Sequence, residues 1–243
     1  MERLQKVIAE SGYTSRRKAE ELIKAGKVYV NDRKVTELGT KVSGDDVIIV
    51  NGTMLKKEDK VYFLLNKPRG VITTVSDDKE RTTVVDLIDT KKRIYPVGRL
   101  DYNTTGILIL TNDGELDNIL THPRHLVPKT YVAKLNRVLE IEDLKKIQKG
   151  VLVEDRICKP TRVKLKSVDK AKDNCLVEIT IVEGRNHIVK KLFETCGYLV
   201  DKLTRTSYGF LTLDGLKSGE YRELSIKEVH KLYDYKNTNK KVR

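Results

Sequence analysis

The stretch that most constrains the fold is a polar loop that runs directly into an apolar strand. Residues 98–106 read Gly-Arg-Leu-Asp-Tyr-Asn-Thr-Thr-Gly, and an unbroken apolar run follows over 107–110. A short apolar run beside turn residues is typical of a buried strand. Arg99 and Asp101 therefore lie on a loop held by a rigid neighbour, where functional side chains are often found. An ordinary turn accounts for the same residues equally well, because Asp, Asn and Gly all favour turns.

Apolar spacing in the first fifty residues predicts a small, separate domain. Residues 3–11 and 16–25 carry apolar side chains at helical spacing, and a serine precedes the second helix as a suitable cap. Alternating residues predict strands over 27–31 and 47–50. Two short helices followed by a small hairpin indicate a compact N-terminal domain over residues 1–51.

A second and larger domain is predicted over residues 61–235. Residues 52–60 lack an apolar pattern and are interpreted as a linker. The last eight residues, 236–243, contain four basic residues and no acid. They are predicted to be disordered and to touch RNA without sequence specificity. The larger domain is expected to contain strands over 62–65, 107–111, 129–135, 161–166 and 175–182, and helices over 115–120, 141–149 and 188–196.

The charge of the chain indicates a polyanionic partner. Its 243 residues carry a formal net charge of +13, which suits nucleic acid or an acidic membrane surface. Arg16, Arg17 and Lys18 open the second predicted helix, where the helix dipole prefers anions. Because phosphates bind both helix N-termini and basic side chains, RNA contact is favoured there over a charge run that only faces solvent.

Other features exclude several classes of protein. The three cysteines are odd in number and widely spaced, so we expect reduced thiols and no disulfide framework. No Cys-x-x-Cys pair occurs, and Pro123 separates His122 from His125, so no metal site is expected. No glycine-rich nucleotide loop indicates a cofactor. The chain has no 18-residue apolar run and no signal-like start, so we expect a cytoplasmic protein that does not enter a membrane.

Four motifs together resemble those of the pseudouridine synthases. The first is Gly-Arg-Leu-Asp over 98–101, followed by Thr-Gly over 105–106; the aspartate is the essential residue of that family, which by resemblance is Asp101. Asn-Lys-Pro-Arg-Gly over 66–70 is similar to the segment that opens the catalytic domain. Lys-Thr-Tyr over 129–131 resembles the second catalytic motif. The strand–Gly–helix unit around 183–196 resembles the third.

The resemblance implies roles for individual side chains. Tyr131 would stack on uracil, although a lone strand tyrosine is ordinarily a packing residue. Lys190 would lie beside Asp101 as the basic residue of the third motif. Ile188 stands where many relatives have Gln, which puts a polar role of that position in doubt here. For His187, a capping or packing role at the helix start is at least as well supported as catalysis.

The same resemblance suggests which basic residues meet RNA. Arg99 would fill the gap left by an extruded uridine or hold a flanking phosphate, unless it only braces the loop through an ion pair. Lys67 and Arg69 lie in a turn where RNA backbone contact and simple solvation are equally good interpretations. Arg185 is a further RNA-binding candidate, and it is next in line should Lys190 lie away from Asp101. In the N-terminal part, the helix start at 16–18 resembles that of an S4 RNA-binding domain.

The resemblance implies an α+β protein, in which a small S4-like domain precedes a mixed, mainly antiparallel sheet with a central cleft. The expected activity is the isomerisation of a specific uridine in ribosomal RNA to pseudouridine, a redox-neutral reaction that needs no cofactor. It requires a carboxylate near the sugar and the base, a cation beside it, and a pocket for the rotating base.

The large-subunit branch of this family is favoured by similarity along the whole chain. The small-subunit enzyme, which has the same architecture, is the nearest alternative. A non-catalytic S4-type RNA-binding or ribosome-assembly protein is an alternative of a different class. The expected partner is ribosomal RNA or a ribosomal assembly intermediate, and the expected state is a monomer.

Overall fold

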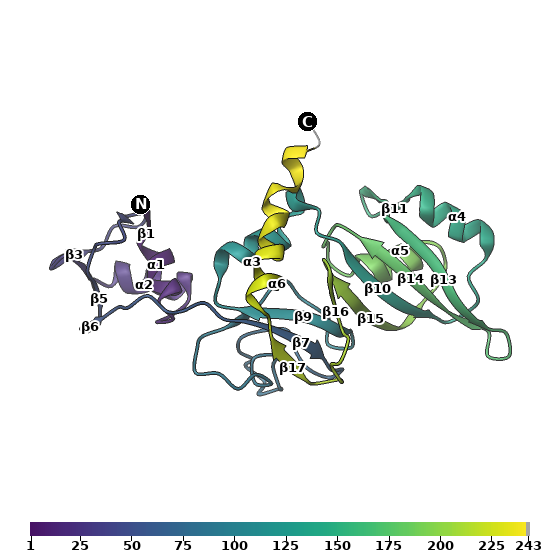
Figure 1. Ribbon diagram of the computed structural model, residues 1–243, viewed down its shortest axis with the longest axis horizontal. Helices are drawn as coiled ribbons and strands as arrows, with labels where there is room; N and C mark the ends of the chain where they lie inside the picture. Colours follow the sequence, from purple (N-terminus) through teal and green to yellow (C-terminus); the bar gives the residue numbers. More distant parts are fainter. Residues whose placement is uncertain (242–243) are drawn as a thin grey trace. The chain divides into compact units, whose positions relative to one another are not determined.

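The structure of the chain, a computed structural model, describes residues 1–241 and consists of two compact units (Figure 1). The first unit contains residues 1–61, together with two short segments at 90–94 and 112–114. The second unit contains the other described residues. The fold agrees with the predicted α+β class, because both units combine helices with mainly antiparallel sheets.

The first unit combines two helices with small antiparallel sheets. Helix α2 begins after Ser15, whose side chain accepts a hydrogen bond from the backbone nitrogen of Lys18 at 3.2 Å. The apolar faces of both helices meet the sheet in a core that includes Leu4, Ile8 and Ile23, all fully buried. The elements are α1 (Leu4–Glu10), α2 (Arg16–Lys24), a sheet in the order β3 (Arg33–Val35), β2 (Val28–Val30), β5 (Ile48–Val50), β6 (Thr53–Met54), and the pair β1 (Glu2–Arg3) with β4 (Lys41–Val42).

The first unit extends further than its predicted boundary at residue 51. Strand β6 lies within the predicted linker, yet Thr53 pairs with Val50 and Met54 pairs with Ile49. Leu55 also packs against the small core. The turn at 51–52 reverses the chain, so that the residues after it continue the sheet. The linker assignment over 52–60 is therefore wrong at its beginning.

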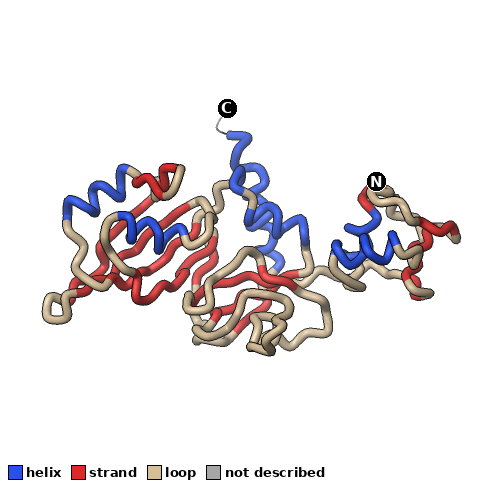
Figure 2. The backbone as a smooth tube through the Cα atoms, turned by 180° about the vertical axis from the view of Figure 1, so that it is seen from behind, coloured by secondary structure: helices blue, strands red, loops and turns tan. Residues whose placement is uncertain are grey.

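The second unit is built on a sheet of nine strands. Figure 2 shows its strands in red, with helices in blue beside them. Along its main path only β15 and β9 run parallel, and the other described neighbours are antiparallel. The main path is β13 (Arg162–Asp169), β14 (Asn174–Ile181), β10 (Lys129–Leu135), β15 (Val200–Tyr208), β9 (Thr105–Thr111), β7 (Tyr62–Lys67), β17 (Tyr221–Glu223), with β16 (Leu211–Thr212) on β15 and β8 (Tyr95–Pro96) on β9.

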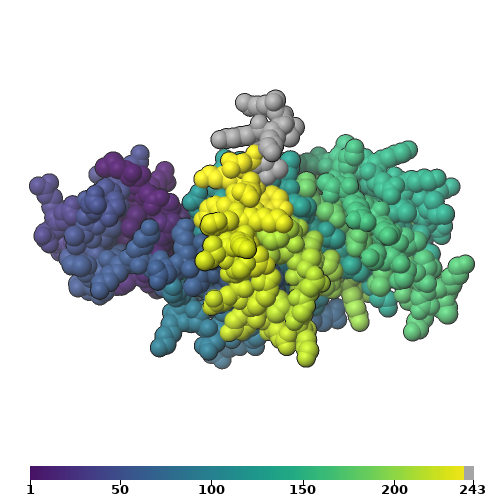
Figure 3. Space-filling view, viewed as in Figure 1, coloured from purple at the N-terminus to yellow at the C-terminus, as the bar shows by residue number. Residues whose placement is uncertain are grey.

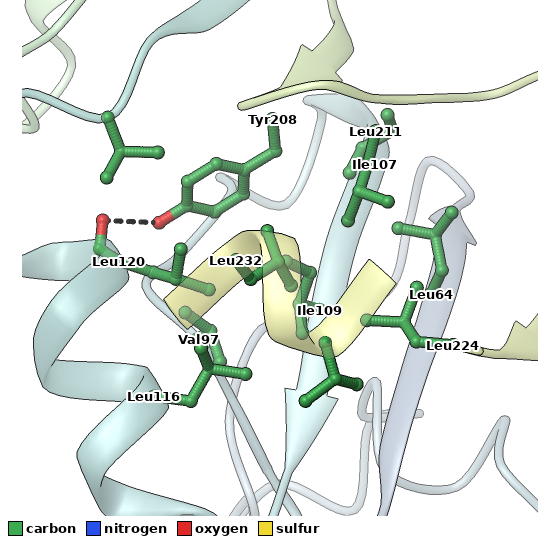
Figure 4. Close-up of a cluster of buried hydrophobic side chains, with 12 residues drawn as sticks. Leu64, Val97, Ile107, Ile109, Leu116, Leu120, Tyr208, Leu211, Leu224 and Leu232 are labelled. Carbon is green, nitrogen blue, oxygen red and sulfur yellow. Dashed lines mark hydrogen bonds between the residues drawn. The ribbon is translucent and has the colours of Figure 1, made fainter. Parts of the chain in front are cut away.

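A cluster of buried hydrophobic side chains lies between this sheet and two helices, α3 (Gly114–Thr121) and α6 (Ile226–Tyr233). Figure 4 shows Ile107 and Ile109 of β9 among leucines from α3, α6 and the neighbouring strands. The hydroxyl of Tyr208 donates a hydrogen bond to the carbonyl oxygen of Leu120 at 2.9 Å within this cluster. The apolar run that follows the polar loop is thus a central, buried strand, as its sequence predicts.

Two further helices and a hairpin complete the second unit. Helix α5 (Ile188–Thr195) buries Leu192 and Phe193 and contacts both β15 and the hairpin of β11 (Val151–Val153) and β12 (Arg156–Cys158). Helix α4 (Ile141–Lys149) contacts β13. The helix predicted to run to residue 196 ends one residue earlier, with Cys196 as its cap.

Residues 236–241, which were predicted to be disordered, are helical in the structure, and their contact with RNA stays a prediction. They continue helix α6 as a 3-10 helix, η2 (Asp234–Lys241), because Asp234 keeps helical backbone angles and Tyr235 packs against the large core. Lys236 forms an ion pair with Glu115 at 2.7 Å. Figure 3 shows the C-terminal segment, in yellow, on the surface of the second unit. Residues 242 and 243 of the predicted tail lie outside the described residues. Within residues 1–241, no helix has the length and apolar character that crossing a membrane requires.

Candidate active site

The polar loop at 98–104 is held from beneath by a buried lysine. Lys67, at the end of β7, donates to the carbonyl oxygens of Pro68 and Thr104 at 3.0 Å each and to that of Tyr102 at 3.4 Å. The Thr73 hydroxyl fixes the loop from another side by donating to the Leu100 carbonyl oxygen at 2.6 Å. Burial lowers the pKa of Lys67 to about 8, against the opposing influence of the nearby Asp101 charge.

These contacts correct the prediction that Lys67 binds RNA. Its side chain is fully buried, and its ammonium is used to organise the loop from inside the protein. A lysine that follows a buried strand can point either outward into the turn or back under the neighbouring loop, and here three carbonyl oxygens hold it inward. Lys67 is therefore a positioning residue for the loop that carries Asp101.

Gly106 allows the loop and its strand to approach β15 closely. Its φ is +106°, and a Cβ at this position would lie 2.1 Å from the carbonyl oxygen of Arg205. This is the place where β9 and β15 pair in parallel, with Gly106 opposite Arg205. Because only glycine fits, the Thr-Gly ending of the motif sets the distance between the Asp101 loop and the strand that carries Arg205.

Asp101 is held by two nitrogen-bearing side chains from the region around the start of α5. The Lys190 ammonium lies 2.6 Å from Oδ2, and His187 Nε2 lies 3.0 Å from Oδ1. The Thr104 hydroxyl also points to Oδ2, at 3.4 Å. The Asp101 side chain keeps 30% of its surface exposed, so the carboxylate is anchored yet still open to a ligand. The proximity of Lys190 to Asp101, expected from the third motif, is present in the structure.

His187 lies beside Asp101, whereas the sequence favoured a capping or packing role at the helix start at least as strongly as catalysis. Its backbone is left-handed, with a φ of 55°, and its side chain makes no capping bond at the start of α5. The imidazole instead reaches the Asp101 carboxylate. The turn that ends β14 and begins α5 thus delivers two polar side chains, three residues apart, to the same carboxylate.

A pocket beside Asp101 has both apolar and polar walls. Tyr131 of β10 lines it, with a side chain that is 9% exposed, and Leu203 of β15 lies on the neighbouring strand. Ile188 and Val189 of α5 line the same pocket. Ile188, which stands where many members of the family have Gln, is buried and contributes apolar surface to the pocket. The pocket is therefore suited to a flat, partly apolar ring next to a carboxylate.

Two basic side chains of this pocket were not found from the sequence. Lys129 is 8% exposed and Arg205 is 2% exposed, and both lie against the ring of Tyr208. Strand β15 was not among the predicted strands, because its residues are mostly polar and only Leu203 and Tyr208 suggest a buried face. Without that strand, nothing in the sequence places Arg205 beside the second motif.

The predicted RNA-contacting residues fall into separate places. Arg99 is exposed at the pocket, and Arg69 is exposed in its turn, where it donates to the carbonyl oxygen of Asp201 at 3.4 Å. Arg185 lines the pocket as well, but it is engaged by Glu183 at 2.5 Å and by the Val153 carbonyl oxygen at 3.0 Å. The basic start of α2 belongs to the first unit and is exposed; we call it the α2 basic triplet, which consists of Arg16, Arg17 and Lys18.

Within residues 1–241, no group of three or more His, Cys, Asp or Glu side chains is arranged to hold a metal ion. The three cysteines are free thiols, two of them buried. The described site combines one carboxylate and its lysine and histidine partners with one tyrosine and the two cations of the pocket.

Comparisons with known proteins agree along the whole chain. A family model for RNA pseudouridylate synthase matches residues 61–195, and a model for the S4 domain matches residues 2–48. The chain is 53% identical over 233 residues to ribosomal large subunit pseudouridine synthase B of Bacillus subtilis (strain 168), with 96% of each chain covered. It is 42% identical over 234 residues to an uncharacterized RNA pseudouridine synthase of Aquifex aeolicus, with 95% and 93% covered. A pseudouridylate synthase crystal structure superimposes with a TM-score of 0.67 at 34% identity, covering 96% of this chain and all of that one.

Proposed function

The chain belongs to the RNA pseudouridylate synthase family, and we propose that it converts a specific uridine of large-subunit ribosomal RNA to pseudouridine with Asp101 as the catalytic carboxylate. The observation that carries this proposal is the placement of Asp101 at a pocket lined by Tyr131, with the Lys190 ammonium 2.6 Å from Oδ2. An ionised carboxylate beside a pocket for a flat base is what breaking and remaking a glycosidic bond requires.

Lys190 and His187 each contact one oxygen of this carboxylate. Each is within 3.0 Å of a different oxygen, so the plane of the carboxylate is fixed by two contacts. Lys190 stabilises the negative charge that Asp101 needs, either to attack the sugar or the base or to abstract a proton. His187 contributes orientation and is more exposed than Lys190.

Tyr131 and the aliphatic walls supply a place for the base while it turns. After the bond to the sugar breaks, uracil must rotate before C5 can face C1′, and the pocket must retain it during that time. Tyr131, Leu203 and Ile188 line the pocket and offer apolar surface to such a ring. We therefore assign Tyr131 to stacking on uracil.

RNA binding is assigned to both units. The target uridine must leave its stack to reach Asp101, which costs a few kcal/mol. Arg99, exposed two residues before Asp101, is placed to fill the vacated position or to hold a flanking phosphate. Arg69 is exposed and suited to the RNA backbone, whereas Arg185 is already paired with Glu183 and would have to exchange that partner. The α2 basic triplet would bind phosphates of the RNA backbone.

The choice of large-subunit ribosomal RNA rests on the name of the Bacillus subtilis relative and its 53% identity. The small-subunit enzyme remains the nearest alternative, and a purely RNA-binding role would leave the Asp101–Lys190 pair and its pocket without a purpose. We further propose that the protein acts in the cytoplasm as a monomer, on ribosomal RNA or on an assembly intermediate.

The experiment is to map pseudouridines in both ribosomal RNAs of a strain that lacks this gene and to restore the gene on a plasmid. We expect one site in large-subunit RNA to disappear and to return with the wild-type gene. Loss of a pseudouridine in small-subunit RNA instead would identify the protein as the small-subunit enzyme. Unchanged maps for both RNAs would contradict the proposed enzymatic function.

A further inference from the structure

Two cations in the pocket, Lys129 and Arg205, have no carboxylate partner among the residues that the structure describes. Arg205 donates through Nε to the Ile107 carbonyl oxygen at 2.8 Å, while its buried Nη2 has no hydrogen-bond partner. Lys129 donates to the Val127 carbonyl oxygen at 3.2 Å. Neither cation forms an ion pair with a carboxylate among the side chains that the structure describes. The ring of Tyr208 lies 5.0 Å from the Lys129 ammonium and 4.9 Å from the Arg205 guanidinium carbon.

This arrangement is unfavourable for folding. A buried charge without a partner costs folding stability, and two like charges in one pocket add repulsion. Burial, together with the nearby Arg205, lowers the pKa of Lys129 to about 8, as expected for an ammonium in an uncompensated positive environment. The pocket is thus preorganised for an oxygen that carries negative charge.

The proposed reaction produces such an oxygen. When the N1–C1′ bond of uridine breaks, its electron pair remains on the base, and the charge is shared between N1 and the carbonyl oxygens. After rotation, a pair of electrons at C5 forms the new bond to C1′, C5 loses its proton and N1 gains one, so no oxidant or reductant is needed. If the carboxylate instead adds to C6, the charge again moves onto a carbonyl oxygen.

We propose that Lys129 and Arg205 bind a carbonyl oxygen of uracil and stabilise the negative charge that the base carries during the reaction. This charge arises either when the N1–C1′ bond breaks or when the carboxylate adds to C6. This inference rests on the proposed function and adds a second charged group of residues to it. Asp101 and Lys190 act on the sugar side of the pocket, whereas Lys129 and Arg205 act on the base. Donors fixed in advance toward developing charge in a water-poor site are an effective form of catalysis.

The test begins with Lys129→Met, compared with Lys134→Met on the same strand, β10. Lys134 does not line the pocket and serves as the control. Loss of one preorganised donor typically lowers kcat by about 100-fold or more. We expect that loss in single-turnover pseudouridine formation by Lys129→Met, with unchanged RNA affinity and a melting temperature equal to or above that of the wild type. A variant that fails to fold would show that the lysine is structural and would overturn the inference.

The decisive comparison uses the same RNA with 5-fluorouridine at the target position. Fluorine at C5 withdraws electrons and stabilises the base anion by itself, so the deficit of Lys129→Met should shrink to less than about tenfold for consumption of the fluorinated nucleotide. Equal deficits on both RNAs, or no deficit on either, would overturn the role of Lys129. If the wild type converts neither RNA, the proposed function itself fails, which is a separate result.

Discussion

Replacing Gly106 with alanine should disrupt the junction that brings the Asp101 loop to β15. The new Cβ would lie 2.1 Å from the carbonyl oxygen of Arg205, 2.8 Å from its nitrogen and 2.9 Å from its carbonyl carbon. All three are backbone atoms, so no side chain can swing aside. The two strands would have to separate by roughly 1 Å, and β9 is buried on both sides.

The expected cost follows from two effects. Forcing an extra carbon into a packed interior costs about 1–3 kcal/mol, and holding a non-glycine residue in a strained backbone region costs about 1–3 kcal/mol more. The φ of Gly106 is +106°, well outside the range that L-residues commonly adopt. Gly106→Ala should therefore lower the free energy of unfolding of the second unit by about 2–6 kcal/mol.

Urea unfolding followed by circular dichroism measures this change. With a slope of about 2 kcal/mol per molar urea, the midpoint should fall by about 1–3 M. Gly184→Ala is the matched control for stability, because a Cβ there meets no atom within 4 Å and its backbone is not left-handed. If Gly106→Ala unfolds within about 0.5 kcal/mol of the control, the close approach of β9 and β15 does not set the geometry of the site.

Three further outcomes are expected. Lys190→Met should reduce turnover by about 10- to 100-fold, which corresponds to the loss of one charged hydrogen bond, and should leave RNA affinity nearly unchanged. The control Lys191→Met should reduce turnover only slightly. Equal turnover by the two variants would contradict the role of Lys190. Glu228 caps α6, and its hydrogen bonds from Arg222 lower its pKa to about 2, so its stabilisation is complete above about pH 4.5 and is lost as the pH falls toward 2. Glu228→Gln should therefore cost about 1 kcal/mol at pH 7, discounted for partial exposure, and nothing near pH 2 in thermal melts. Changing the α2 basic triplet to Gln should reduce the slope of log affinity against log salt by about 0.7–0.9 per lost phosphate contact; an unchanged slope would exclude it from the RNA interface.

The sequence predicts an element correctly where neighbouring residues alone determine its structure. The apolar run after Gly106 has only one favourable place, a buried strand, and the serine before α2 caps that helix as expected. The pairing of Lys190 with Asp101 spans 89 residues, so it could be expected only from the resemblance of two motifs to one family.

The errors have physical causes that local patterns do not reveal. Lys67 is held inward by the carbonyl oxygen of Pro68 and by two carbonyl oxygens, those of Tyr102 and Thr104, from a loop more than thirty residues away. Strand β15 gains its place from its neighbours β9 and β10, since its own residues are mostly polar. For that reason Arg205, which owes its burial to this strand, could not be recognised in advance. His187 has a left-handed backbone and contacts Asp101, and its residue type alone indicates neither.

The most direct test of the central claim is pseudouridine formation by Asp101→Asn on ribosomal RNA under single-turnover conditions. The amide keeps the shape of the side chain but removes the charge that Lys190 holds at 2.6 Å. We expect product formation below about 1% of the wild-type rate, with RNA binding reduced less than about twofold. Turnover by Asp101→Asn above about 1% of the wild type would contradict the assignment of this carboxylate as the catalytic group.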